Sequence, residues 1–547
     1  MVKKYFLLLI GMFIFGRTNS QDVFQHISNS NIYEFLDELA NQHIFTLNTA
    51  IKPYSRHLIA DKLNEAETKK DKLSKNQQKQ LDFFLRDYNK ELKTENRTNY
   101  LFWGSEGYKK RVDLFYFKDS LFTLSINPVF GYEYWKNENG NAYHRWEGAE
   151  AIAYIGPHVG IYASLRDNHE DHVLELPSFL TQRPAAVYKG PAIVGGDYSE
   201  ARGGIVYSWK WGHLGLIKDH FTWGNNYNGA NIFSGKTPSF AHIKLNMKPV
   251  SWLDFNYVHG FLVSDVLDTG RHYAAGGAER QVLVPKFLAA NMFTITPLKK
   301  LNFSFGNSIV YSDEFQLAYL IPVYFFKSVD HTTTNTGGNF LGQNAQFYFD
   351  ISSRQIKYVH LYISFFVDEV SIKNLSDEKN QSNFFSGKIG IAINPPFVPN
   401  TTFIAEYTRT NPIVYRHFVN TTTFESNGFN MGHYLRDNAE EIFLGIRCRP
   451  IPRLYVNASM TMAKVGESYI YTGQNGTGKG LPFLADTKWK NNVMSFKARF
   501  EVINDGFVFA GVDYGKITGD SAYVAAYTPA LFRGKTTTVN VGVNFGF

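Results

Sequence analysis

Residues 536–547, TTTVNVGVNFGF, alternate between apolar and polar side chains up to the last position of the chain. The apolar positions are Val539, Val541, Val543, Phe545 and Phe547, and asparagines and glycines fill the positions between them. Successive side chains of a β-strand point to opposite faces, so this segment predicts a strand with one apolar face and one polar face. A strand of this kind at the end of a chain needs a partner strand elsewhere in the sequence.

The same two-residue period recurs from about residue 119 onward. On one segment, for example, Ile243, Leu245 and Met247 alternate with Lys244 and Asn246. We predict eighteen strands in all, at residues 121–134, 142–155, 158–166, 201–210, 212–222, 239–248, 251–263, 286–296, 299–311, 345–353, 356–366, 386–394, 400–410, 440–449, 452–464, 491–501, 505–516 and 536–547.

The connections between the predicted strands alternate in length. Tight turns, such as the one at Pro450, follow the even-numbered strands, whereas long loops follow most odd-numbered strands. A soluble β-sandwich also alternates, but an even number of strands with short turns at one end and long loops at the other is typical of outer-membrane barrels. We therefore expect an all-β transmembrane barrel of eighteen antiparallel strands. Its last strand must pair with its first, because an open edge in lipid leaves backbone groups unsatisfied at several kcal/mol each.

The region before the first predicted strand divides into three parts. Residues 1–20 combine two lysines, an apolar stretch and small or polar residues, which predicts a secretory signal peptide. Residues 21–97 predict a small α-helical domain, with Asn31, Ser55 and Ser74 as the expected helix caps. Residues 98–118 form a connector, and the barrel with its long loops occupies residues 119–547. Since the helical domain precedes the first strand, we expect it on the short-turn side, in the periplasm, and the long loops outside the cell.

Composition excludes several other classes of protein. The chain has 547 residues, 16% of them aromatic, a net charge of +7 and a single cysteine, Cys448. One cysteine cannot form an internal disulfide, which excludes a disulfide-stapled scaffold. The 56 basic residues are scattered along the chain, so nucleic acid is not an expected partner. Outer-membrane lipid and an acidic polysaccharide are the expected partners of a mildly basic exported protein.

The sequence offers no convincing catalytic or cofactor motif. There is no GxSxG segment for a hydrolase, and the phosphate-loop-like stretch at 473–480 has Gly480 where a Ser or Thr must bind magnesium. We therefore predict that the protein is not an enzyme and needs no cofactor. His169 and His172, three residues apart with two acids between them, are weak candidates for a loop cation site; otherwise we expect no metal.

Residues 219–265 combine aromatic side chains with asparagine, serine and glycine. A sugar stacks its C–H face on an aromatic ring, and amide side chains bond its hydroxyl groups, so this composition suits glycan recognition. The alternative is that the same tryptophan and tyrosine residues belong to the aromatic girdle of a membrane barrel.

Three segments of the sequence resemble the Wzi family of outer-membrane capsule-assembly proteins. They are YEFLDELANQHIFTLNTAIKPYSRHLIADKL at 33–63, WGNNYNGANIFSGKTPSF at 223–240, and EYTRTNPIVYRH with NGFNMGHYLRDNAEE between 406 and 441. The resemblance implies a periplasmic helical bundle on an eighteen-stranded barrel. It also implies a lectin-like protein that binds capsular or another surface polysaccharide and helps to attach it to the cell, without catalytic residues.

Our candidate glycan contacts are Arg183, Trp223, Asn225, Tyr227, Arg416, His417 and His433. If the Trp223 indole stacks on sugar, Trp223→Ala is expected to weaken glycan binding without lowering the amount of folded barrel. We also expect the loops at 167–200 and 312–344 to close most of the barrel mouth.

Two other functions stay open on the sequence alone. An accessory subunit of a larger envelope complex would use the N-terminal helices as its docking surface. A porin or substrate-specific channel needs an open lumen, and the polar interior of a plugged barrel has the same composition as that of an open one. The expected lumen-lining residues are Lys244, Lys248, Glu406, Arg447, Lys497 and Arg499.

Overall fold

The computed structural model describes residues 21–92, 100–101, 111–190, 194–333, 342–369, 372–374, 376–377, 379–472 and 478–546. The expected signal peptide at 1–20 lies outside the described residues, as do most of the connector at 98–118 and the terminal Phe547.

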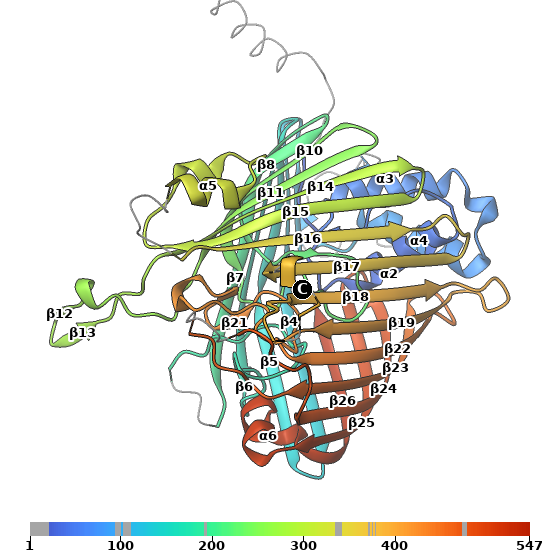
Figure 1. The fold of residues 1–547 in the computed structure, drawn as a ribbon. Coiled ribbons are helices and arrows are strands. Elements are labelled where there is room, and N and C mark those ends of the chain that lie inside the picture. Colours follow the sequence, from blue (N-terminus) through green and yellow to red (C-terminus); the bar gives the residue numbers. More distant parts are fainter. Residues whose placement is uncertain are drawn as a thin grey trace, which may run out of the picture.

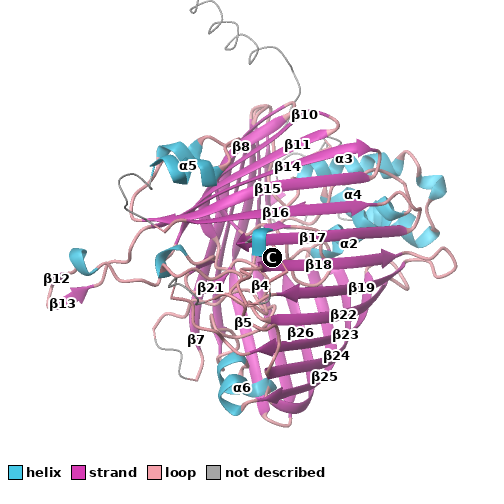
Figure 2. Ribbon diagram, in the orientation of Figure 1, coloured by secondary structure: helices cyan, strands magenta, loops and turns pink. Residues whose placement is uncertain are grey.

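Eighteen antiparallel strands form one closed barrel, which confirms the strand count expected from the sequence (Figures 1 and 2). Each predicted segment overlaps one strand of the ring. The strands are β4 (Phe122–Asn137), β5 (Gly140–Ile155), β6 (Val159–Glu170), β7 (Gly196–Trp209), β8 (Gly212–Asp219), β10 (Phe240–Val250), β11 (Leu253–Leu262), β14 (Lys286–Leu298), β15 (Leu301–Ser312), β16 (Asn344–Ser353), β17 (Val359–Glu369), β18 (Phe384–Ile393), β19 (Thr401–Thr410), β22 (Ala439–Cys448), β23 (Leu454–Gly466), β24 (Thr487–Ile503), β25 (Gly506–Gly519) and β26 (Gly534–Phe545).

The last strand closes the barrel by pairing with the first. β26 pairs with β4 from Val539 opposite Lys136 to Phe545 opposite Phe130, and the rings of that last pair stack with their centroids 5.8 Å apart. The remaining half of the same β4 edge pairs with β3 (Phe115–Lys118), which in turn pairs with β2 (Tyr100–Leu101). These two short strands lie in the expected connector, where we predicted no strand, so the connector completes the seam of the barrel.

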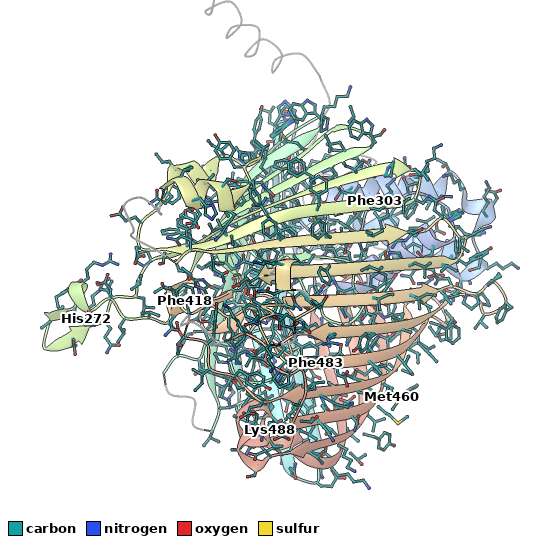
Figure 3. The ribbon with its side chains drawn as sticks, in the orientation of Figure 1. His272, Phe303, Phe418, Met460, Phe483 and Lys488 are labelled. Atoms are coloured by element: carbon teal, nitrogen blue, oxygen red, sulfur yellow. The ribbon has the colours of Figure 1, made fainter. Side chains whose placement is uncertain are left out.

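The outer wall of the barrel is apolar. On β24, for example, Met494 and Phe496 expose 56% and 51% of their surface, while the inner face of the strands carries buried polar and charged groups. Figure 3 shows Phe303 and Met460 on this outer wall. A soluble sandwich would bury the apolar face, so the observed arrangement is that of a transmembrane barrel. No helix among the described residues is long and apolar enough to cross a membrane.

Three helices cover one end of the barrel: α2 (Ser30–Asn41), α3 (Arg56–Glu67) and α4 (Lys75–Asp87). The Ser55 side chain caps α3, and Ser74 with Gln77 forms a capping box at the start of α4, as expected. The expected capping role of Asn31 is wrong. α2 begins at Ser30 without a side-chain cap, so Asn31 lies inside the helix, and its amide donates to Glu501 of the barrel at 2.8 Å.

The helices are docked on the short turns between strands by buried polar contacts. Arg354 donates to Asp37 at 3.0 Å, and Arg449 donates to Glu38 at 2.8 Å. In Figure 1 the helices lie at the right-hand end of the strands. The helical domain therefore sits at the short-turn end, which agrees with its expected position relative to the barrel.

The lumen is filled by segments that enter it from both ends. Within it, β1 (Ile51–Lys52) of the helical domain pairs with β9 (Thr222–Trp223) of the loop at 220–239, which follows β8. We call this loop the plug loop. Its apolar side chains form one core with Ala50, with residues of the 411–438 loop, and with inward-facing side chains of the wall such as Val258, Leu288 and Tyr348. Long side chains and backbone therefore occupy the space that an open channel would need.

The long loops lie at the opposite end of the barrel (Figure 1). They carry a projecting hairpin of β12 (Tyr273–Ala275) and β13 (Ala278–Arg280), and the short strands β20 (Glu425–Ser426) and β21 (Phe429–Asn430). They also carry the helices α5 (Phe326–Thr333) and α6 (Ser521–Tyr527). Single 3-10 turns complete the described elements: η1 (Lys70–Lys72), η2 (Thr269–Arg271), η3 (Leu317–Leu320), η4 (Ile372–Asn374), η5 (Asn420–Thr422) and η6 (Ala530–Phe532).

The described part of the loop after β15, up to residue 333, does not close the barrel mouth, contrary to our expectation for residues 312–344; residues 334–341 lie outside the described residues. The described part lies on the outer wall, where Tyr257 donates to the Tyr319 carbonyl at 2.6 Å and the Tyr319 ring lies 4.7 Å from that of Tyr311. Tyr311 is on the same face of β15 as Phe303 and Phe305, whose side chains are exposed on the outside. The apolar residues of this loop cover part of the outer wall instead of the mouth.

Candidate functional site

The plug loop is held in the lumen by acidic side chains of the wall. The Asn225 backbone N–H donates to Asp350 at 2.7 Å, and the Tyr227 backbone N–H donates to Glu406 at 2.7 Å. The Asn228 amide donates to Glu441 at 2.9 Å. Carboxylates that accept hydrogen bonds from a loop replace the water that would otherwise solvate both groups. These buried acids therefore anchor the loop.

Trp223 lies at the centre of the plug. It exposes only 1% of its surface, and its ring is surrounded by those of Phe233, Phe221 and Tyr348, with centroids 5.2, 5.8 and 5.9 Å away. The neighbouring Asn225 is equally buried. The indole offers no open face to a sugar ring in this structure, and its burial makes it a packing residue of the plug.

The remaining candidate contacts lie on the plug loop and on two other long loops that are packed against it. Arg183 donates to Glu170 at 2.8 Å, and Arg416, about one-third exposed, pairs with Asp437 at 2.8 Å. A hydrogen bond of 2.8 Å joins the His417 ring nitrogen Nδ1 to the Thr422 hydroxyl group, and burial lowers the pKa of His417 to about 4. Tyr227 and His433 contact the acids that hold the plug, at Glu406 and Glu441. The loops themselves are joined by Gln182 to Asn228, Ser234 to Met431 and Tyr415 to Asn231.

The six expected lumen-lining residues divide into two groups. Lys248 and Lys497 keep exposed side chains. The other four contact the segments that fill the barrel. Lys244 Nζ lies 4.0 Å from the centre of the Phe24 ring, and Arg499 donates to Ser30 at 2.9 Å. Both remaining residues contact the Tyr227 backbone: Glu406 accepts from its N–H, and Arg447 donates to its carbonyl at 2.9 Å. Most of these inward charges therefore have partners in the plug or the helical domain.

A pocket of about 530 Å³ opens at the rim of the barrel, on the long-loop side. We call it the rim pocket. It lies between the start of β18, the end of β19 and the loop after β23. The residues that give it its chemistry are Lys379, Gln381, Asn383, Arg409, Asn411 and Phe483.

Arg409 and Phe483 form one wall of the rim pocket. The Arg409 guanidinium carbon lies 3.8 Å from the centre of the Phe483 ring, and Arg409 Nε donates to Asn411 at 2.9 Å. An arginine stacked on a ring and held by an amide is oriented before a ligand arrives. Figure 3 labels Phe483 beside the ends of the strands.

The rim pocket lies above the apolar belt of the barrel. Along β19, Phe403 and Tyr407 are outward-facing and exposed, and Arg409 occupies the next position of the same face. Opposite Arg409 on β22 stands Glu440, which pairs with Lys464 at 2.7 Å. Charged side chains replace apolar ones on the outer wall at this level, so the pocket faces water just beyond the membrane.

Sequence reasoning missed this pocket. We read the segment around 473–480 as a flexible surface loop, and its first part, 473–477, lies outside the described residues. The described part is fixed, because Gly480, at φ +61°, donates its N–H to the Gln381 carbonyl at 3.0 Å. The available signal was the GKGLPF stretch at 478–483, in which two glycines allow a sharp turn and place an aromatic residue after it.

The two weak cation candidates are not brought together. His169 pairs with Asp197 at 2.6 Å, and His172 pairs with Asp171 at 3.2 Å. Among the residues that the structure describes, neither histidine belongs to a group of three metal-ligating side chains. Each of the two histidines instead forms a pair with one carboxylate at the surface.

A buried pair joins the loop at 171–190 to the plug loop and makes its attachment pH-dependent. Glu175 is fully buried and lies 3.3 Å from Lys236 Nζ. Burial raises the pKa of Glu175 from its ordinary 4.5 to about 7, against the opposing effects of Lys236, Thr181 and Arg183. When the loop opens, the carboxyl group returns to water and its pKa falls back. The closed loop therefore binds a proton more tightly than the open loop and loses stability as the pH rises from about 4.5 to about 7.

We expect proteolytic cleavage within 171–190 to become faster between pH 5.5 and pH 8, relative to cleavage of the exposed β12–β13 hairpin in the same molecule. Glu175→Gln removes the titrating group and is expected to abolish this change in the cleavage ratio. A ratio that is the same at both pH values in the native protein would contradict the assigned role of Glu175.

Comparison with known proteins shows the fold. Searches with protein-family models and against curated protein sequences find no match to this chain. Among solved structures, the chain is similar to Wzi, an outer-membrane protein involved in group 1 capsule assembly in Escherichia coli and described as a carbohydrate-binding β-barrel. The identity is 11%, the match covers 96% of this chain and 100% of that one, and the TM-score is 0.56. The resemblance to the Wzi family is thus confirmed at the level of the fold.

Weaker similarities involve barrels of other bacteria. OccD3 of Pseudomonas aeruginosa is 12% identical over 77% of this chain and 90% of its own, with a TM-score of 0.42. OccAB2 of Acinetobacter baumannii is 9% identical over 77% of this chain and 97% of its own, with a TM-score of 0.43.

Proposed function

We propose that this outer-membrane barrel binds a surface polysaccharide at its long-loop end and helps to hold it on the cell, without catalysing a reaction. In this proposal the helical domain lies in the periplasm and the long loops face the outside. The observation that carries the proposal is the rim pocket, in which Arg409 stacks on Phe483 beside the amides of Gln381, Asn383 and Asn411. Rings and amides are the groups that recognise sugars.

The position of the rim pocket suits a long polymer. A polysaccharide that runs along the cell surface reaches a pocket outside the wall without entering the lumen. Lys379, which is exposed, and Arg409 add two positive charges, so an acidic polysaccharide is favoured over a neutral one.

Three further observations support binding over the alternatives. The plug fills the lumen, which speaks against a porin or substrate-specific channel. The chain also shares its fold with Wzi, whose description names it as a carbohydrate-binding barrel of capsule assembly. The helical domain is already engaged with the barrel through Arg354 and Arg449, which leaves less of its surface for an envelope partner.

The test compares two double variants. Arg409→Ala with Phe483→Ala removes the stacked pair of the rim pocket. Tyr273→Ala with Arg280→Ala removes a similar pair in the exposed β12–β13 hairpin, where the guanidinium lies 5.6 Å from the ring centre. We expect purified rim-pocket variant to bind the cell's own surface polysaccharide at least about tenfold more weakly, a loss of about 1.4 kcal/mol, and the hairpin variant to bind normally.

The same variants are then compared in cells. Deletion of the whole protein is expected to raise the ratio of released to cell-attached polysaccharide at unchanged total synthesis, and loss of the rim pair is expected to do the same. If the deletion strain keeps its polysaccharide attached, the attachment function is wrong. If deletion releases it and the rim variant does not, attachment stands and the rim pocket is not the contact.

A further inference from the structure

Two histidines and an aspartate meet inside the barrel, where the plug loop leaves β8. His26 belongs to the segment before α2, whereas Asp219 and His220 lie at the end of β8. His26 Nε2 lies 3.1 Å from His220 Nδ1 and 3.7 Å from Asp219 Oδ1, and His220 Nδ1 lies 3.8 Å from the same oxygen. A point equidistant from the three atoms is roughly 2.1 Å from each, the length of a zinc–imidazole bond.

The groups behind these three side chains are arranged as in metal sites. His220 Nε2 lies 3.2 Å from Glu200 Oε1, and Tyr162 donates to the second oxygen of Asp219 at 2.9 Å. Outer partners of this kind fix the tautomer and the orientation of metal ligands. A cavity of about 220 Å³, lined by both histidines, leaves room for a water molecule or another ligand in a fourth position.

One cation lies beside these three side chains. Arg202 opposes the ion, because its NH1 lies 3.6 Å from Asp219 Oδ1 and competes for that oxygen.

We propose that His26, Asp219 and His220 bind one divalent transition-metal ion, with zinc as the best match. Two imidazoles and one carboxylate suit zinc and its neighbours, whereas calcium and magnesium prefer oxygen ligands alone. The ion joins the segment before α2 to the point where the plug loop begins. It therefore fastens the helical domain and the plug to the same position of the barrel wall.

The test is titration of the folded, full-length protein with Co²⁺ in detergent after treatment with a chelator. The visible spectrum of bound Co²⁺ reports its nitrogen and oxygen ligands. We expect one Co²⁺ per chain, displaced by Zn²⁺. His26→Gln is expected to weaken uptake at least about a hundredfold, the upper end of what losing an outer partner of a metal site costs. His169→Gln and His172→Gln, in the surface histidine–carboxylate pairs, are the matched controls and are expected to bind normally.

His26 is the variant of choice because its side chain keeps 14% of its surface exposed, whereas those of Asp219 and His220 keep only 2% and 5%. Near-ultraviolet circular dichroism checks that each variant is folded. The proposal is overturned if the native protein takes up no stoichiometric metal, which is the result expected if the two rings only share a hydrogen bond. It is equally overturned if His26→Gln binds as tightly as the native protein, or if uptake is lost in the His169 and His172 controls.

Discussion

A variant in which residues 221–238 are replaced by a turn of about four residues is expected to conduct ions in planar bilayers, whereas the native protein is expected to stay silent. The replaced residues include Trp223, Phe233 and Tyr227, which fill the middle of the lumen. Barrels of 16 to 18 strands leave an aqueous channel when nothing fills them. Removing the plug loop therefore changes conductance from none to that of a partly open pore.

The geometry of the wall allows this replacement. Asp219 at the end of β8 already pairs with Phe240 at the start of β10, so a short turn can join them as in an ordinary hairpin. The matched control shortens the loop after β11, replacing residues 266–283, which form the exposed β12–β13 hairpin outside the barrel. This control is expected to stay silent. Equal conductance of the native protein and the plug variant would show that the plug does not block the lumen.

Lys388→Met is expected to lower the free energy of unfolding by about 3–5 kcal/mol, the cost of leaving one member of a buried ion pair without its partner. Lys388 Nζ lies 3.3 Å from Glu406, and both side chains are fully buried. Lys388 also donates to the Asn228 carbonyl at 3.0 Å, while Glu406 accepts from Tyr227. The pair thus ties the plug loop to the wall, and its loss leaves an unpaired carboxylate in the lumen.

Equilibrium unfolding in lipid vesicles measures this effect. The double variant Lys388→Met with Glu406→Gln removes both charges and is expected to recover part of the loss, because no unpaired charge remains. Lys464→Met breaks the pair with Glu440, in which Lys464 is about half exposed, and is expected to cost less than about 1 kcal/mol. A double variant that is as unstable as Lys388→Met alone would mean that the lost packing, and not the unpaired charge, causes the instability.

The barrel could be predicted from the sequence because its pattern is local. The alternation of Val539, Val541 and Val543 with Asn540 and Gly542 is visible within one segment and recurs in other segments, such as the one around Leu245. The capping box at Ser74 is equally local. By contrast, Asn31 matches a helix cap in the sequence and forms its hydrogen bond with Glu501, 470 residues away, which no local pattern contains.

The functional residues were harder to predict, because a sugar-binding site and a loop packed inside a barrel both use aromatic rings and amide side chains. Trp223 among asparagines and glycines matches a sugar site, but the same amides are needed to bond wall acids such as Asp350 when a loop folds inward. Arg409 continues the outward alternation of β19, so the sequence shows where the face becomes charged. That Phe483 lies over it depends on a loop from a distant hairpin, and the sequence holds no periodic signal for that contact.

The small sheet of β1 and β9 gives the molecule a mechanical property. Its backbone pairs connect a segment anchored in the helices at one end of the barrel to a loop anchored at the other. Within this connection Gly224 donates its N–H to the Ala50 carbonyl at 2.7 Å. A pull on the helices along the barrel axis is therefore shared between the wall, on which the helices are docked, and this inner connection to the plug loop.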